Sequence, residues 1–257
     1  MRTLLVASLA VLGAVSGAVS GIGAASAGRI DQLTEHKLFA PDPQRFGLYG
    51  YASAVNGNRM VIGAFLTDGV VPQTGAAYVY QRIDGEWIVQ AKLIAPDGQE
   101  GEIFGTSVAV DGHTVVIGAP GAATADGTRV GAAYVYRLVA GQWILEAKLF
   151  ASDPREFGNF GFDQGVSIQG DTLVVAAAGP ENGEGAITGG GAVYVFTRHG
   201  STWTQTARLA NPEGDARFSF GNSVSLSGRT LVVGASSSDE AAGAAYGEAY
   251  TYDLHED

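Results

Sequence analysis

The chain repeats one hexapeptide four times, and this repetition constrains the fold more than any local signal does. Gly75-Ala-Ala-Tyr-Val-Tyr80 recurs as 131–136, as 191–196 and, less closely, as 247–252, with steps of 56, 60 and 56 residues between the glycines. Self-similarity at a fixed period of this size is typical of solenoids, propellers and other repeat architectures. The repeats cover approximately residues 37–91, 92–147, 148–207 and 208–257.

Each repeat contains the pattern of four β-strands, and the second repeat shows it most clearly. The β-rich runs 104–110 and 114–118 are joined at Asp111-Gly112, which favours a two-residue type I′ hairpin. The hexapeptide 131–136 then predicts a third strand with aromatic side chains on one face and small ones on the other. A turn leads to a fourth strand that begins near Trp143 and ends at Lys148-Leu149.

Four-stranded units with two apolar faces are not stable alone and have to pack against their neighbours. Radial packing of such sheets gives a β-propeller, whereas linear stacking gives a solenoid. Units near 56 residues have the size of propeller blades, and solenoid coils are shorter. We therefore predict an all-β propeller of about four blades, each a four-stranded antiparallel sheet, with a linear solenoid as the alternative.

The two ends of the repeat array differ from its middle. The fourth repeat stops after Tyr250-Thr-Tyr252 and has no Trp strand, while the segment Gln32–Leu38 aligns with Val89–Leu93 of the first repeat. The sequence therefore predicts that the N-terminal strand completes the last blade and closes the ring, which removes an exposed sheet edge. A piece cut from a longer array would show the same offset, so truncation is the competing explanation.

The N-terminal residues and the charge predict an exported protein. Residues 1–27 have a basic start, a short apolar stretch and a small-residue end, which indicates a signal peptide cleaved near Ala27 rather than a membrane anchor. This leaves residues 28–257 as one propeller domain. There is no cysteine, and the formal net charge is −11. Such a charge argues against binding to nucleic acid and to anionic membranes, because both need clusters of Lys and Arg.

Several of these residues resemble the FG-GAP repeats that form the blades of the integrin α-chain head. Phe104-Gly105 followed by Gly118-Ala119-Pro120 matches the signature of that family, and residues 191–196 match its usual third strand. In the third repeat the hairpin glycine lies two residues further on, so either that strand is bulged after Phe160-Gly161 or Phe162-Asp163 takes the Phe-Gly place. The chain is most similar to bacterial secreted members. Further positions that share the repeat signature are Tyr49, Gly50, Phe220, Gly221, Trp87, Trp143 and Trp203.

The resemblance does not extend to calcium. Integrin-type blades carry an Asp-rich loop between the first two strands, and here that connection is a tight turn with one acid at most, Asp111. Because Ca²⁺ needs six to eight oxygen ligands, we expect no calcium and no other cofactor. Other acids lie in the connections that lead into the first strand of each blade. Solvation of these turns is the simpler explanation for the acids, and a weak cation site is the alternative. The weak metal candidates are Asp97, Glu100, Glu102, Asp153 and Glu156.

No motif in the sequence proposes catalysis. The histidines have no metal-binding spacing, and no nucleophile elbow occurs. The repeated Trp and Tyr residues could stack on sugars, but residues repeated once per blade more often form packing. We expect a secreted, non-catalytic module for protein or glycan binding and cell adhesion, which uses the variable loops of one face. The alternatives are a lectin-like carbohydrate-binding propeller and, third, a propeller enzyme with an unrecognised site.

Deletion of residues 28–38 tests the predicted role of the N-terminal strand. If this segment pairs with the last blade, its loss removes a whole strand ladder and lowers the free energy of unfolding by several kcal/mol. Thermal and urea melts of the shortened chain measure this change. An unchanged melting midpoint would contradict the predicted closure.

Overall fold

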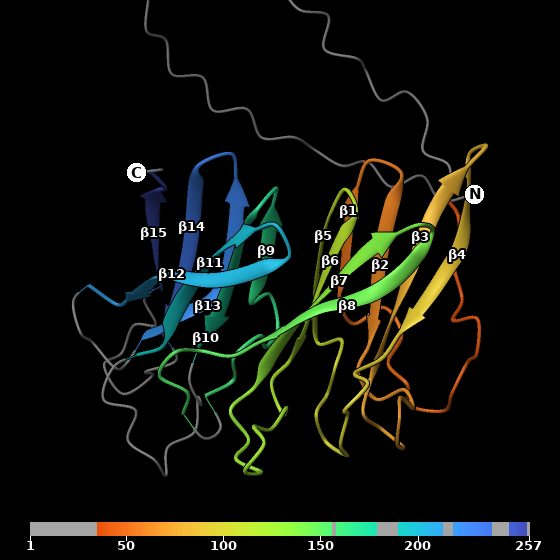
Figure 1. Cartoon of the computed structure of the whole chain (residues 1–257), viewed down its shortest axis with the longest axis horizontal. Helices are drawn as coiled ribbons and strands as arrows, with labels where there is room; N and C mark the ends of the chain where they lie inside the picture. Colours follow the sequence, from red (N-terminus) through yellow and green to blue (C-terminus); the bar gives the residue numbers. More distant parts are fainter. Residues whose placement is uncertain (1–34, 156–157, 179–189, 213–217, 238–246, 256–257) are drawn as a thin grey trace, which may run out of the picture. The chain divides into compact units, whose positions relative to one another are not determined.

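The fold is described from a computed structural model (Figure 1). The residues that the structure describes are 35–155, 158–178, 190–212, 218–237 and 247–255. The chain divides into two units, Met1–Leu38 and Phe39–Asp257, and every described strand lies in the second. The predicted signal peptide, residues 1–27, lies outside the described residues. Within the described ranges, no helix is long and apolar enough to cross a membrane.

The strands form four antiparallel sheets arranged as the blades of a four-blade β-propeller, which confirms the predicted fold class. Blade 1 contains β1 (Ser53–Asn56), β2 (Arg59–Ala64), β3 (Ala76–Ile83) and β4 (Glu86–Leu93). Blade 2 contains β5 (Ser107–Asp111), β6 (Thr114–Ala119), β7 (Ala132–Val139) and β8 (Gln142–Leu149). Blade 3 contains β9 (Val166–Gln169), β10 (Thr172–Ala177), β11 (Ala192–His199) and β12 (Thr202–Ala210). Blade 4 contains β13 (Phe218–Ser227), β14 (Thr230–Ser237) and β15 (Gly247–Asp253).

The hairpin between the first two strands of each blade forms as predicted, but its turn residues are shifted by one position. Asp111 pairs with Thr114, so the central residues are Gly112 and His113. Of these two, Gly112 alone has a positive φ, 50°, as in a type II′ turn. The predicted type I′ turn is therefore wrong, because Asp111 is still part of the strand.

The residue before each turn glycine has a second role, which is to hold the next blade. The Asp111 carboxylate accepts a hydrogen bond from the backbone N–H of Gly170 in blade 3 at 2.6 Å. Asn56 receives the equivalent bond from Gly112 at 3.4 Å, and Gln169 receives it from Gly228 at 2.5 Å. A side chain with an acceptor oxygen at this position therefore links each hairpin to the one that follows it.

The alternating faces of the third strand form the cores between the blades. Tyr134 and Tyr136 of β7 pack toward blade 1, where they join one buried cluster with Val79. Ala133 and Val135 point the other way and join the cluster between blades 2 and 3. A third cluster of the same kind joins blades 3 and 4. The predicted division into an aromatic face and a small apolar face is thus what connects consecutive blades.

Repeated glycines allow the backbones of neighbouring blades to touch. Gly75 forms a parallel bridge with Phe104 of the next blade, and the Phe104 N–H donates to the Thr74 carbonyl at 2.9 Å. Gly75 has φ 97°, and a Cβ at this position would overlap with the Phe104 carbonyl oxygen. Gly131 meets Phe160 in the same way, which also shows that Phe160-Gly161 holds the Phe-Gly place in the third repeat. Glycine is therefore required by both the conformation and the available space.

The outer faces of the first and last blades have more open surroundings. Val55 of blade 1 is 65% exposed, whereas its equivalent in blade 2, Val110, is 7% exposed. Gly50, the equivalent of Gly105, has no described residue's atom within 4 Å of a hypothetical Cβ. In the part that the structure describes, blade 4 has three strands and residues 35–38 form none. Residues 32–34 lie outside this part, so completion of the last blade by the N-terminal segment stays a prediction.

Two glycine substitutions test the contact between blades. Gly75→Ala places a Cβ against the next blade in a left-handed conformation, so we expect the free energy of unfolding to fall by roughly 3 kcal/mol. Gly247 holds the same place in blade 4, but among the described residues its hypothetical Cβ meets only the Ala235 carbonyl oxygen, at 3.9 Å. Gly247→Ala is thus the matched control and should change stability by less than about 0.5 kcal/mol. Urea melts that give equal effects for both variants would refute this account of the interface.

Candidate functional site

In blades 1 to 3, one aspartate of the connection that leads into the blade is bound by a cationic and a phenolic side chain. In blade 2, Asp97 accepts hydrogen bonds from the Tyr134 hydroxyl at 2.9 Å and the Lys148 ammonium at 2.7 Å. The same three-residue arrangement, here called the Asp latch, recurs in blades 1 and 3. Its members there are Asp42, Tyr78 and Lys92, and Asp153, Tyr194 and Arg208.

The Asp latch explains why these acids are repeated. Burial disfavours the charged Asp97 carboxylate, but hydrogen bonds from Lys148 and Tyr134 outweigh this effect, so the pKa of Asp97 is lowered. Burial and the bond to Asp153 raise the pKa of Tyr194 to about 12, so this phenol stays protonated as a donor. The latch ties the loop that enters a blade to the third and fourth strands of that blade.

The weak metal candidates are spread over two blades, although Asp97 and Glu102 of blade 2 both contact the Tyr134 hydroxyl. Asp97 and Asp153 lie in the latches of different blades, and the backbone carbonyl of Glu100 accepts a bond from Arg129 at 2.8 Å. Glu156 lies outside the described residues. Among the described side chains, no group of three or more His, Cys, Asp or Glu residues could hold a metal ion. The oxygens of Asp97 and Asp153 already have cationic partners from the protein itself.

A pocket of about 350 Å³ lies on the loop side of blade 2, and we call it the loop pocket. Two loops meet there: the Gly121 N–H donates to the Glu102 carbonyl at 3.1 Å, which joins the entry loop to the connection between β6 and β7. Figure 1 shows these connections at the lower end of the strands, opposite the hairpins. The lining residues are Asp97, Gln99, Glu102, Ala123, Thr124, Ala125, Gly127, Lys148 and Phe150.

Glu102 is the unusual member of the loop pocket. It stands where blades 1 and 3 have Gly47 and Gly158, two residues before the aromatic-Gly pair, and it is only 1% exposed. Burial raises the pKa of Glu102, although the nearby Lys148 opposes this shift. Its carboxylate accepts a weak hydrogen bond from Tyr134 at 3.4 Å. A buried acid that breaks the repeat is a functional candidate, because the scaffold does not need it.

A second pocket, the axial cavity, has a volume of about 400 Å³ and lies against the first strands of all four blades. The two extra residues of the third repeat form a turn here, with the Gly165 N–H bonded to the Phe162 carbonyl at 2.9 Å. The Asp163 carboxylate accepts a hydrogen bond from the Tyr51 hydroxyl of blade 1 at 2.8 Å. The lining residues are Tyr51, Ala52, Ser53, Thr106, Ser107, Val108, Asp163, Gln164, Val166 and Val224.

The axial cavity was not predicted as a site from the sequence. The sequence contains one signal for it, the two-residue offset after Phe160-Gly161, which we interpreted only as a question of strand register. The structure confirms the bulged alternative and shows that the inserted residues Asp163 and Gln164 line the cavity. An interruption of an otherwise regular repeat is thus the feature that could have located the site.

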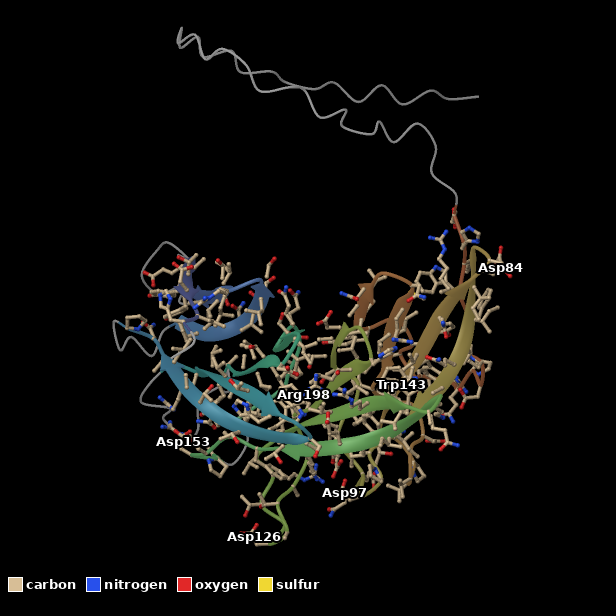
Figure 2. All side chains as sticks on the ribbon, turned by 45° about the horizontal axis from the view of Figure 1, so that its top comes forward. Asp84, Asp97, Asp126, Trp143, Asp153 and Arg198 are labelled. Atoms are coloured by element: carbon tan, nitrogen blue, oxygen red, sulfur yellow. The ribbon has the colours of Figure 1, made fainter. Side chains whose placement is uncertain are left out.

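Two of the repeated tryptophans, Trp143 and Trp203, lie between blades and not on an open platform. The Trp143 indole N–H donates to Gln90 of blade 1 at 3.0 Å, and the Arg59 guanidinium lies over the ring at 5.3 Å. The Trp203 indole N–H donates to Glu146 of blade 2 at 3.4 Å, and Arg198 of its own blade lies over the ring at 5.2 Å. Figure 2 shows Trp143 and Arg198 among the strands, whereas Asp126 lies at the tip of a loop. Such placement fits packing, since the ring faces are covered by guanidinium groups.

Two substitutions in the loop pocket test these electrostatics with opposite signs. Because the pKa of Glu102 is raised in the folded state, its ionisation lowers stability as the pH increases. Glu102→Gln should therefore raise the melting midpoint at pH 7 and change it little near pH 4, where the carboxyl is protonated. Asp97 has a lowered pKa and stabilises the fold when ionised, so Asp97→Asn should lower the midpoint at pH 7. Its effect should disappear as the pH falls below the ordinary value for Asp.

Melting midpoints of both variants between pH 3 and 8 measure these effects. A Glu102→Gln variant that is less stable than the unmodified chain at pH 7 would show that Glu102 is held as a stabilising anion, contrary to this description.

Comparison with known families agrees with the geometry of the blades. The family described as FG-GAP repeat matches residues 33–80, 87–136, 143–196 and 203–252, which is more than half of the chain. Three of the matched units begin in the outer strand of a blade, at the tryptophan of β4, β8 or β12. A comparison with curated proteins gives no match. The chain belongs to the FG-GAP repeat family.

Proposed function

We propose that this chain is an exported, non-catalytic binding module that contacts a protein or glycan through the variable loops of one face. FG-GAP repeats are typical of extracellular proteins, and the propeller fold is consistent with a binding module. Fold alone does not define a ligand, so the proposal depends on the site. No metal or other cofactor is part of the proposed binding.

The observation that carries the proposal is the loop pocket. Its volume of about 350 Å³ lies within the range of ligand sites, and it combines one cation, two acids and an aromatic ring, Phe150. It is formed by the two connections that vary most between repeats, while the strands beneath keep the repeat pattern. Variable loops on a rigid scaffold are where recognition is commonly located.

A pair of arginine substitutions tests where binding occurs. Ala125 is exposed and lines the loop pocket, so Ala125→Arg obstructs the pocket without disturbing the core. His113→Arg places the same side chain on the exposed hairpin turn at the opposite end of blade 2. We expect the chain to select ligands from a printed glycan array or a phage-displayed peptide library. Binding should fall at least about tenfold in Ala125→Arg and remain unchanged in His113→Arg.

The same experiment separates the alternatives. Selection of glycans alone favours the lectin-like alternative, and selection of peptides favours a protein-binding module. Binding that survives EDTA supports the absence of a metal requirement. Equal loss of binding in both arginine variants, or none in Ala125→Arg, would contradict the proposed role of the loop pocket.

A further inference from the structure

The axial cavity has features that the propeller scaffold does not require. In blade 2 the hydroxyl of Thr106 is buried and has no hydrogen-bond partner among the described residues, although the residue is only 1% exposed. Burying a hydroxyl without a partner costs free energy, and a valine would fill the same space without that cost. The next residue, Ser107, has its partner: it donates to the Gly161 carbonyl at 2.5 Å. Thr106 is therefore the one of this pair that lacks a structural explanation.

The opposite side of the cavity presents a carboxylate in a constrained position. Asp163 has φ 49°, in the left-handed region that non-glycine residues rarely adopt. It lies in the two-residue insertion of the third repeat, and Tyr51 of blade 1 binds one of its oxygens. The neighbouring Gln164 is held by backbone contacts, because its carbonyl accepts a bond from the Val224 N–H at 3.1 Å. Side chains from blades 1, 2 and 3 therefore surround one space.

The lining chemistry limits the ligand. It offers hydroxyl groups, one amide, one carboxylate and one aromatic ring, and it contains no Lys, Arg or His among the described residues. An anionic ligand would meet a carboxylate without a compensating cation. An organic cation would have a single carboxylate and a single aromatic ring, fewer than a cation cage provides. A neutral molecule with several hydroxyl groups can donate to Asp163 and exchange hydrogen bonds with Thr106, Ser53 and Gln164.

We propose that the axial cavity binds one neutral sugar of about monosaccharide size. The volume of about 400 Å³ is sufficient for such a ligand. In this arrangement Asp163 accepts hydrogen bonds from sugar hydroxyls. The Thr106 hydroxyl is covered in the structure, and a rotation of the Thr106 side chain about χ1 brings it to the sugar, which supplies the hydrogen bond that it lacks. The proposal concerns a site separate from the loop pocket, so either one can be wrong without the other.

Titration of the purified chain with defined sugars tests the proposal. Glucose, galactose, mannose and N-acetylglucosamine are the probes, with saturation-transfer NMR to detect binding and calorimetry to measure its affinity and stoichiometry. Glucose 6-phosphate and choline serve as the anionic and cationic comparison compounds. We expect at least one neutral sugar to bind at one site per chain, and both charged compounds to bind more weakly.

Two isosteric variants then locate the sugar. Thr106→Val removes the hydroxyl, and Asp163→Asn keeps an acceptor for Tyr51 but removes the charge. Each should weaken sugar binding at least about tenfold. Thr106→Val should also melt at or above the temperature of the unmodified chain, which a merely structural hydroxyl would not allow. His113→Arg, on the exposed hairpin turn between β5 and β6, is the control and should leave sugar affinity unchanged.

Three results would overturn the proposal. One is that no neutral sugar binds at millimolar concentration. Another is that choline or glucose 6-phosphate binds more tightly than every neutral sugar. The third is that sugar binds with the same affinity to the unmodified chain and to Thr106→Val, because the ligand would then occupy another site. If Asp163→Asn fails to fold, Thr106→Val alone decides.

Discussion

The close backbone contact between consecutive blades is the constraint on which the rest of the structure depends. A glycine at the start of the third strand meets the Phe-Gly pair of the next blade, and there is no space for a Cβ between them. The contact fixes the spacing of the sheets. The aromatic face of one blade can therefore pack against the small apolar face of its neighbour. The hexapeptide first seen at residues 75–80 therefore recurs because each interface between consecutive blades has the same shape.

This constraint divides the chain into scaffold and candidate sites. The recurring residues that the structure describes have structural partners: the latch acids of blades 1 to 3 bind a tyrosine and a cation, and Trp143 and Trp203 bind the preceding blade. Residues that interrupt the pattern are the ones left to explain. Glu102 replaces a glycine and is buried in the loop pocket, and Asp163 lies in an insertion at the axial cavity. Both proposals use these interruptions.

Much of the fold could be predicted from the sequence because period and alternation are local signals. The strands of the second repeat, the two faces of residues 131–136 and the hairpins all follow from patterns within about ten residues. The role of the loop acids was harder to predict. The partner of Asp97 is Lys148, which lies 51 positions away in the last strand of the same blade. A carboxylate that is matched by a distant lysine looks in sequence like an unpaired one.

The sites were harder to predict because they depend on how loops and blades meet. The exposed loop residue Ala125 and the buried Glu102 belong to different connections, and only the fold brings them to one pocket. Similarly, Tyr51 and Asp163 are 112 positions apart, and the cavity that they share exists only when the blades surround an axis. The sequence shows that residues are inserted after Phe160-Gly161, but it does not show that the inserted Asp163 and Gln164 line the cavity.

Amide hydrogen exchange measured by NMR tests most directly whether contacts between blades hold the propeller together. The Phe104 N–H crosses to the Thr74 carbonyl of the preceding blade at 2.9 Å, whereas the amides of β6 and β7 bond within blade 2. If the blades depend on one another, Phe104 exchanges as slowly as Val116 and both report global unfolding. Fast exchange at Phe104 beside strong protection at Val116 would show that each blade is stable by itself, and would contradict this account.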